Sequence, residues 1–93
     1  MAVAGTDGVE LSRLEQTGRD CPSQWDAWTD DGRYLYIRYR HGCLTVEAAN
    51  SKQDWWDGTT EHLLEAQLSP DQWDGRLTTA DMLNATGLTM PKR

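Results

Sequence analysis

The chain has 93 residues, of which 15 are acidic and 9 basic, and its formal net charge of −6 argues against a protein that coats duplex DNA by neutralising phosphates. Its length predicts one domain, residues 1–93, that is too small to enclose a large active-site cavity. The chain has no apolar run near the ~18 residues that a membrane span needs, and its start does not have the pattern of a signal peptide. It also has too few cysteines for a disulfide-stabilised secreted scaffold, so we expect a cytoplasmic protein with no membrane association.

The first predicted element covers residues 9–16, after N-terminal residues 1–7 that we expect to be flexible. Its apolar spacing fits neither a strand nor a helix cleanly. A short helix would be capped by Thr6 or Asp7, with Glu10 three residues further on. We favour a strand from Val9 to Gln16, because the residues that follow it have the composition of a loop that leads into another strand.

Residues 24–40 contain two further strands joined by the sequence Asp-Asp-Gly. A three-residue loop with Gly32 in the left-handed conformation places Trp25 opposite Ile37 and Ala27 opposite Leu35. A two-residue turn at Asp31-Gly32 would reverse the faces. We favour the longer loop because it keeps one face of the sheet apolar.

Residues 34–49 give the clearest signal, a β-hairpin whose two-residue turn is His41-Gly42. Such turns need positive φ, which Gly adopts without steric cost and His tolerates. A shift by one residue would mix apolar and polar side chains on each face, so the pattern fixes the register. The predicted cross-strand pairs are Tyr34–Ala49, Leu35–Ala48, Tyr36–Glu47, Ile37–Val46, Arg38–Thr45, Tyr39–Leu44 and Arg40–Cys43.

Two more elements are predicted after a long connection over residues 50–60. Residues 61–68 alternate as a strand does, which places His62, Leu64, Ala66 and Leu68 on one face. Ser69-Pro70 with Gln72 has the pattern of a helix start that Gly75 ends within about a turn. A second helix is expected over residues 79–86, capped by Thr78 and ended by Gly87, with Met82, Leu83 and Ala85 packed on the sheet. Residues 89–93 should be flexible. We therefore predict an α+β fold: an antiparallel four- or five-stranded β-meander with one or two short C-terminal helices.

One face of the predicted sheet alternates aromatic and basic side chains. Aromatic rings interleaved with guanidinium groups stack single-stranded bases in some domains. The plainer interpretation is an ordinary second side of a sheet, in which Arg38 pairs with Glu47 or Asp26 or the helices cover the face. An exposed Trp in the long connection could anchor a partner, or close a small core as a lid. The candidate binding residues are Trp28, Tyr34, Tyr36, Arg38, Arg40, Trp55 and Trp56.

The sequence contains no pattern typical of an enzyme or a metal site. It has no HExxH, no CxxC and no glycine-rich phosphate loop after a strand. Cys21 and Cys43 could lie near the same end of the sheet, but we favour free thiols over a disulfide or a shared metal. We expect no catalytic residue, no metal ligand and no cofactor.

The stretch WDAWTDDGRYLYIRYRHGCLTVE resembles a pattern in small uncharacterised proteins of actinobacteria and their phages. It consists of Trp, an acidic-Gly turn, Ile-Arg-Tyr-Arg and a Leu-Thr-Val strand, and the start LSPDQW is similar too. The resemblance covers about a third of the chain and implies no activity. An excess of Arg over Lys fits the GC-rich genomes of such organisms.

These observations predict a non-enzymatic interaction module that binds a protein partner or itself, through the Tyr/Trp face or a sheet edge. The alternative is a single-stranded nucleic-acid binder that uses the Tyr and Arg side chains of residues 34–40.

Overall fold

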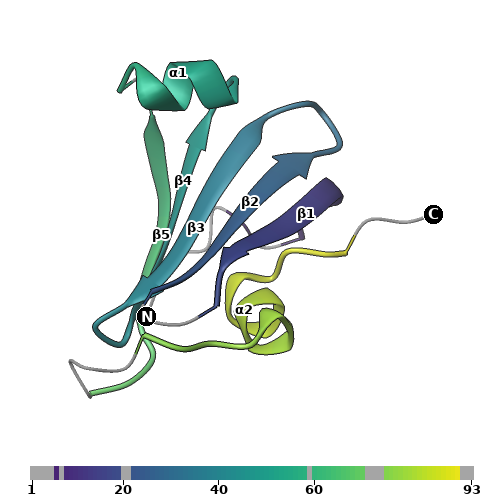
Figure 1. Ribbon diagram of the computed structural model, residues 1–93. Helices are drawn as coiled ribbons and strands as arrows, with labels where there is room; N and C mark the ends of the chain where they lie inside the picture. The colour runs from purple at the N-terminus through teal and green to yellow at the C-terminus, as the bar shows by residue number, and fades with distance from the viewer. Residues whose placement is uncertain (1–5, 7, 20–21, 59, 71–74, 91–93) are drawn as a thin grey trace.

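A computed structural model shows an α+β domain built on one five-stranded antiparallel sheet, as predicted (Figure 1). The structure describes residues 6, 8–19, 22–58, 60–70 and 75–90. The strands lie in chain order, so each pairs with the next along the sequence. They are β1 (Leu11–Gly18), β2 (Ser23–Thr29), β3 (Tyr34–Arg40), β4 (Cys43–Ala49) and β5 (Glu61–Gln67), and the helices are α1 (Lys52–Trp56) and α2 (Thr79–Thr86).

The β3–β4 hairpin has the predicted turn and register. His41 and Gly42 have φ of 56° and 75°, and a two-residue type I′ turn requires positive φ at both of these positions. All seven predicted cross-strand pairs are present, from Tyr34–Ala49 to Arg40–Cys43. The turn chemistry and the apolar alternation therefore agree, which is why this element was predictable.

The β2–β3 hairpin confirms the three-residue loop. Gly32 has φ of 90°, and the backbone N–H of Thr29 donates to the carbonyl of Arg33 at 2.9 Å, which closes the loop. Trp25 pairs with Ile37 and Ala27 with Leu35, so the apolar face continues from β3 onto β2.

The first element is a strand, although β1 begins two residues later than predicted. Its pairing with β2 shifts register twice, between Leu11 and Arg13 and between Gln16 and Gly18. Each irregularity inserts a residue and changes which face the following side chains occupy. These two shifts explain why the apolar spacing of the segment matched no single period.

A bulge in β5 corrects the simple alternation expected there. Val46 pairs with Leu64 and Glu47 with His62, which leaves Leu63 as an additional residue. As a result Leu63 and Leu64, although adjacent, both pack against the hydrophobic core. His62, predicted on the same face as Leu64, pairs instead with Glu47 and therefore lies on the opposite face.

The core lies between one face of the sheet and α2, which has the predicted bounds. The hydroxyl of Thr78 accepts from the N–H of Asp81 at 3.1 Å, and Gly87 ends the helix with φ of 75°. Met82 is buried in the core, and Leu83 and Ala85 pack against it. Beyond the helix, the Thr89 N–H donates to the Val9 carbonyl at 3.0 Å. In the described part of the chain, the buried core cluster consists of Leu11, Trp25, Ala27, Leu35, Ile37, Tyr39, Leu44, Val46, Ala48, Leu64, Met82 and Leu88.

The connection over residues 50–60 contains a short helix that we did not predict. The Ser51 hydroxyl caps α1 by accepting from the N–H of Asp54 at 3.1 Å. The helix start predicted after Ser69 falls on residues 71–74, which lie outside the described residues. Neither helix in the part of the chain that the structure describes is long and apolar enough to cross a membrane.

Candidate binding surface

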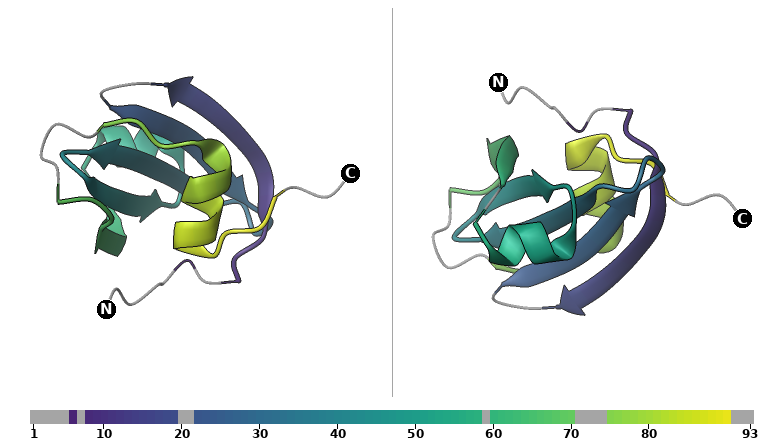
Figure 2. Two further views of the ribbon diagram at one scale, coloured as in Figure 1. Left: turned by 90° about the horizontal axis from the view of Figure 1, so that it is seen from below. Right: turned by 90° about the horizontal axis from the view of Figure 1, so that it is seen from above.

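The two helices lie on opposite sides of the strands, as the view from above shows (Figure 2). Helix α2 covers the apolar face, which includes Trp25 and Ile37. The other face, which we call the second face, carries the alternate side chains of the same strands. Helix α1 reaches only one end of it, near β4. The second face is therefore where the sequence-predicted binding residues lie.

Five aromatic side chains form a continuous cluster at the α1 end of the second face. We call it the aromatic ridge: Trp28, Tyr34, Tyr36, Trp55 and Trp56. The Trp55 ring is central, with its centroid 4.7 Å from that of Tyr36 and 5.1 Å from that of Trp56. Trp55 is half-buried, whereas Trp56 is 68% exposed. One Trp of the pair thus packs on the sheet and the other faces solvent.

A buried polar contact forms the base of the ridge. The Tyr34 hydroxyl donates to Oδ1 of Asp26 at 2.6 Å, and the Lys52 ammonium donates to Oδ2 at 2.9 Å. Asp26 and Tyr34 are both buried, and Lys52 is in the first turn of α1. The carboxylate therefore joins β2, β3 and α1, which fixes Trp55 over the sheet.

The environment of Tyr34 makes the stability of the fold sensitive to alkaline pH. Burial, with the hydrogen bond to Asp26, raises the pKa of the Tyr34 phenol far above its ordinary value. In the unfolded chain Tyr34 ionises near pH 10, whereas in the native state it keeps its proton. The free energy of unfolding should therefore be constant with respect to this group below about pH 10 and fall above it.

Denaturant unfolding between pH 8 and 11.5 measures this effect, and Tyr34→Phe should reduce the alkaline loss. Absorbance at 295 nm reports ionisation of the phenols directly. A Tyr34 that ionised near pH 10 in the folded protein would contradict the assignment. Tyr36, whose pKa burial also raises, should account for part of the remaining loss.

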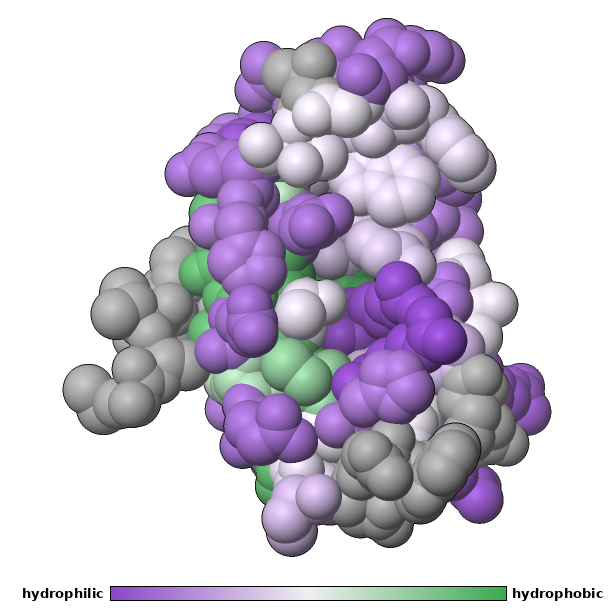
Figure 3. All heavy atoms as spheres, turned by 90° about the vertical axis from the view of Figure 1, so that its left-hand side faces the viewer, coloured by the Kyte–Doolittle hydropathy of each residue, from purple (hydrophilic) through white to green (hydrophobic). Residues whose placement is uncertain are grey.

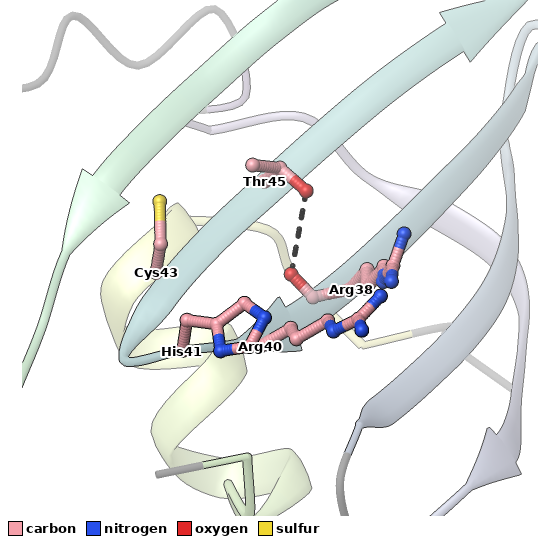
Figure 4. Close-up of a pocket in the computed structure, with 5 residues that line it drawn as sticks. All are labelled: Arg38, Arg40, His41, Cys43 and Thr45. Atoms are coloured by element: carbon pink, nitrogen blue, oxygen red, sulfur yellow. Dashed lines mark hydrogen bonds between the residues drawn. The ribbon is translucent and has the colours of Figure 1, made fainter. Parts of the chain in front are cut away.

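Two arginines lie further along β3 on the second face. Arg38 and Arg40 line an open pocket of about 310 Å³ with His41, Cys43 and Thr45. Their side chains extend in the same direction, beside each other, and the Cys43 thiol points away from them (Figure 4). The Thr45 hydroxyl donates to the Arg38 carbonyl at 3.4 Å. Cys43 is a free thiol whose pKa is raised by burial, so it is not activated as a nucleophile.

The ridge and the arginines lie on the same side of the molecule. Seen from the β5 side, pale side chains of intermediate hydropathy lie above strongly hydrophilic ones on the right of the view (Figure 3). Strand β3 connects the two regions, since Tyr36, Arg38 and Arg40 alternate along it. An aromatic end and a cationic end therefore belong to one surface.

The structure brings the seven predicted residues onto one surface but gives them different roles. Tyr34 is 1% exposed and supports the ridge from beneath. Asp26 pairs with Lys52 of α1 and not with Arg38, and no salt bridge joins Arg38 to Glu47 either. Sequence reasoning missed Asp26 and Lys52 as a pair and His41 as a pocket residue. The pattern Ser51-x-x-Asp54, typical of a helix N-terminus, could have revealed α1 and with it Lys52.

Comparisons of the chain with protein-family models, with curated proteins and with solved structures found no match. Within the described ranges, His, Cys, Asp and Glu side chains form no group of three that could hold a metal ion.

Proposed function

We propose that the protein is a non-enzymatic interaction module that binds a protein partner, or a second copy of itself, through the aromatic ridge. The exposure of Trp56 carries the proposal. A large aromatic ring that is 68% exposed while resting on another ring presents apolar area that a partner can bury. Tryptophan and arginine side chains are the residues that most often dominate the free energy of protein association.

The rigidity of the ridge also supports this role. Trp55 packs on Tyr36 and lies near Tyr34, and the Asp26–Lys52 ion pair fixes the helix that carries both tryptophans. A pre-organised anchor loses little conformational entropy on binding. The cytoplasm, where the free thiol of Cys43 is stable, is the compartment that we propose for this function.

The sheet edges are less suited to binding than the face. Strand β5 carries a bulge at Leu63 and exposed charged side chains at Glu61 and Glu65. Strand β1 shifts register twice. Bulges and charges on edge strands disfavour pairing with another strand, so we assign association to the ridge rather than to either edge.

Photocrosslinking tests the proposal. A photoreactive amino acid at position 56 should crosslink a protein in the cells that produce this chain, or a second copy of the chain, whereas the same group at exposed position 80 on α2 should not. Trp56→Ser should weaken the association at least tenfold without changing the fold. Equal crosslinking from both positions would contradict the proposal. Sedimentation equilibrium separates self-association from binding to another protein.

Single-stranded nucleic acid is the second candidate ligand, because Tyr36, Arg38 and Arg40 share one face of β3. The Arg38→Ala/Arg40→Ala double variant distinguishes it. Nucleic-acid binding predicts that an oligonucleotide binds this variant more weakly and with less dependence on salt, while the fold is intact. Unchanged oligonucleotide binding would exclude the site for nucleic acid.

A further inference from the structure

The two guanidinium groups beside the ridge have no counter-ion among the residues that the structure describes. Salt bridges occur at Arg13, Arg33, Lys52 and His62, but none involves Arg38 or Arg40. The Nε atom of Arg38 is buried and has no hydrogen-bond partner within the described residues. A buried donor without an acceptor is costly, and two like charges on alternate positions of one strand repel each other. Both costs would be offset by an anion in the pocket.

Arginine is suited to a particular kind of anion. Its guanidinium presents a rigid, planar set of donors that matches the two oxygens of a carboxylate, and such paired hydrogen bonds are among the strongest in proteins. Two such groups extend side by side over a pocket of about 310 Å³ (Figure 4). The pocket therefore fits one oxyanion and part of the chain that carries it.

The surroundings of the pocket restrict the size of the anion. Glu65 pairs with Thr45, and Glu47 with Tyr36, so both carboxylates share the second face with the arginines. The positive region is thus small and bordered by negative charge on an acidic protein. A polyanionic nucleic-acid backbone would pass over these carboxylates, whereas one acidic side chain would not. Charge complementarity therefore favours a localised carboxylate.

The distance between the two ends of the surface sets the spacing in the ligand. Tyr36 and Arg40 are four residues apart on β3, which corresponds to about 13 Å along the strand. Trp55 and Trp56 extend the aromatic end further in the direction away from Arg40. An extended peptide that covers both ends needs about four to six residues between its apolar anchor and its acidic group.

We propose that Arg38 and Arg40 form a carboxylate subsite, so that the second face selects an extended segment of a partner protein that places one acidic side chain in the pocket and an aromatic or large apolar residue on Trp56. This inference rests on the proposed protein-binding function and adds the chemistry of the partner.

Selection from a phage-displayed library of random 12-residue peptides tests the inference. Peptides selected on the wild-type protein should be enriched in Asp or Glu about four to six residues from an aromatic or large apolar residue. Arg38→Gln/Arg40→Gln should abolish the acidic enrichment and keep the aromatic one. The control Arg19→Gln/Arg33→Gln also removes two positive charges, but from residues outside the pocket, and it should select the same peptides as the wild type.

A selected peptide and a copy of it in which Glu is replaced by Gln then measure how much the carboxylate contributes to the binding affinity. By amide-shift titration, the Gln copy should bind the wild type at least tenfold more weakly, and the two peptides should bind the Arg38→Gln/Arg40→Gln variant equally.

Several outcomes would overturn the inference. The first is a pool of peptides selected on the wild type that shows no acidic enrichment, and the second is acidic enrichment that persists in Arg38→Gln/Arg40→Gln. The third is a twelve-residue oligothymidylate that binds the wild type more tightly than the acidic peptide does and that no longer binds the Arg38→Gln/Arg40→Gln variant. The last result would assign the subsite to nucleic acid. Another outcome is that the selected peptides show only an aromatic enrichment, which disappears when Trp56→Ser is the target. That result would reject the carboxylate subsite alone and leave the proposed function intact. Photocrosslinking at position 56 decides the proposed function separately.

Discussion

Trp25→Ala should lower the free energy of unfolding by about 3–5 kcal/mol, because it removes a fully buried aromatic side chain and leaves a cavity. Trp25 is 0% exposed and pairs with Ile37 in the centre of the sheet. Its indole N–H donates to the Thr79 hydroxyl at 3.0 Å, which connects β2 to the first turn of α2. Domains of this size are typically stable by about 5–15 kcal/mol, so the loss is a large part of the total.

The chain contains its own control for this substitution. Trp56→Ala removes the same atoms from a side chain that is 68% exposed and should change the free energy of unfolding by less than about 1 kcal/mol. Chemical denaturation followed by circular dichroism measures both variants. Similar losses for the two would contradict the assignment of Trp25 to the core and Trp56 to the surface.

The second large effect is expected from Asp26→Ala, which should cost about 2–3 kcal/mol. The substitution leaves the Tyr34 hydroxyl buried without its acceptor and removes the partner of Lys52. Helix α1 then loses its ion pair with the sheet, so Trp55 should become more mobile. The free energy of unfolding from denaturation and the NMR line width of the Trp55 indole N–H measure the two consequences.

Three conservative variants separate the parts of this contact. Asp26→Asn keeps an acceptor for Tyr34, Tyr34→Phe removes only the hydroxyl, and Lys52→Met removes only the cation. Each should cost about 1 kcal/mol, less than Asp26→Ala, because no buried polar group loses all its partners. A double-mutant cycle between Tyr34→Phe and Lys52→Met reports how strongly the two bonds to the carboxylate are coupled. If Asp26→Ala were no more costly than Asp26→Asn, the buried contact would not be stabilising.

Asp26 connects stability to the proposed function, whereas Trp25 does not. Trp25 lies on the face that α2 covers, and its loss should affect binding only through unfolding. Asp26 lies beneath the ridge, so Asp26→Ala should weaken the association that depends on Trp56 even in the folded protein. Measuring the association of both variants at a temperature where both are folded separates loss of binding through unfolding from loss of binding through the ridge.

The two hairpins could be predicted because local and non-local constraints coincide in them. Gly32 and His41-Gly42 set the loop lengths, and only one register places Trp25, Ile37 and Val46 on a common apolar face. The last helix was predictable for a similar reason. Thr78 and Gly87 determine its ends through backbone hydrogen bonds that a short stretch of sequence specifies on its own.

Irregular pairing could not be predicted from periodicity. The register shifts in β1 and the bulge at Leu63 in β5 depend on how each strand meets its neighbour. A bulge changes the face of every following residue, so an alternation rule fails at that point without any local signal. His62 was consequently placed on the wrong face.

By itself, the sequence determined that this is an antiparallel α+β domain and that Tyr34, Tyr36, Arg38 and Arg40 share a face. Tertiary structure alone decided that α2 covers the opposite face and that Tyr34 is buried beneath a ridge. It also decided that Lys52 pairs with Asp26, so that no carboxylate of the described residues forms a salt bridge with Arg38. Alternation specifies which side chains share a face, but ion pairs form between groups 26 residues apart, and only the packing of α1 brings those groups within 2.9 Å.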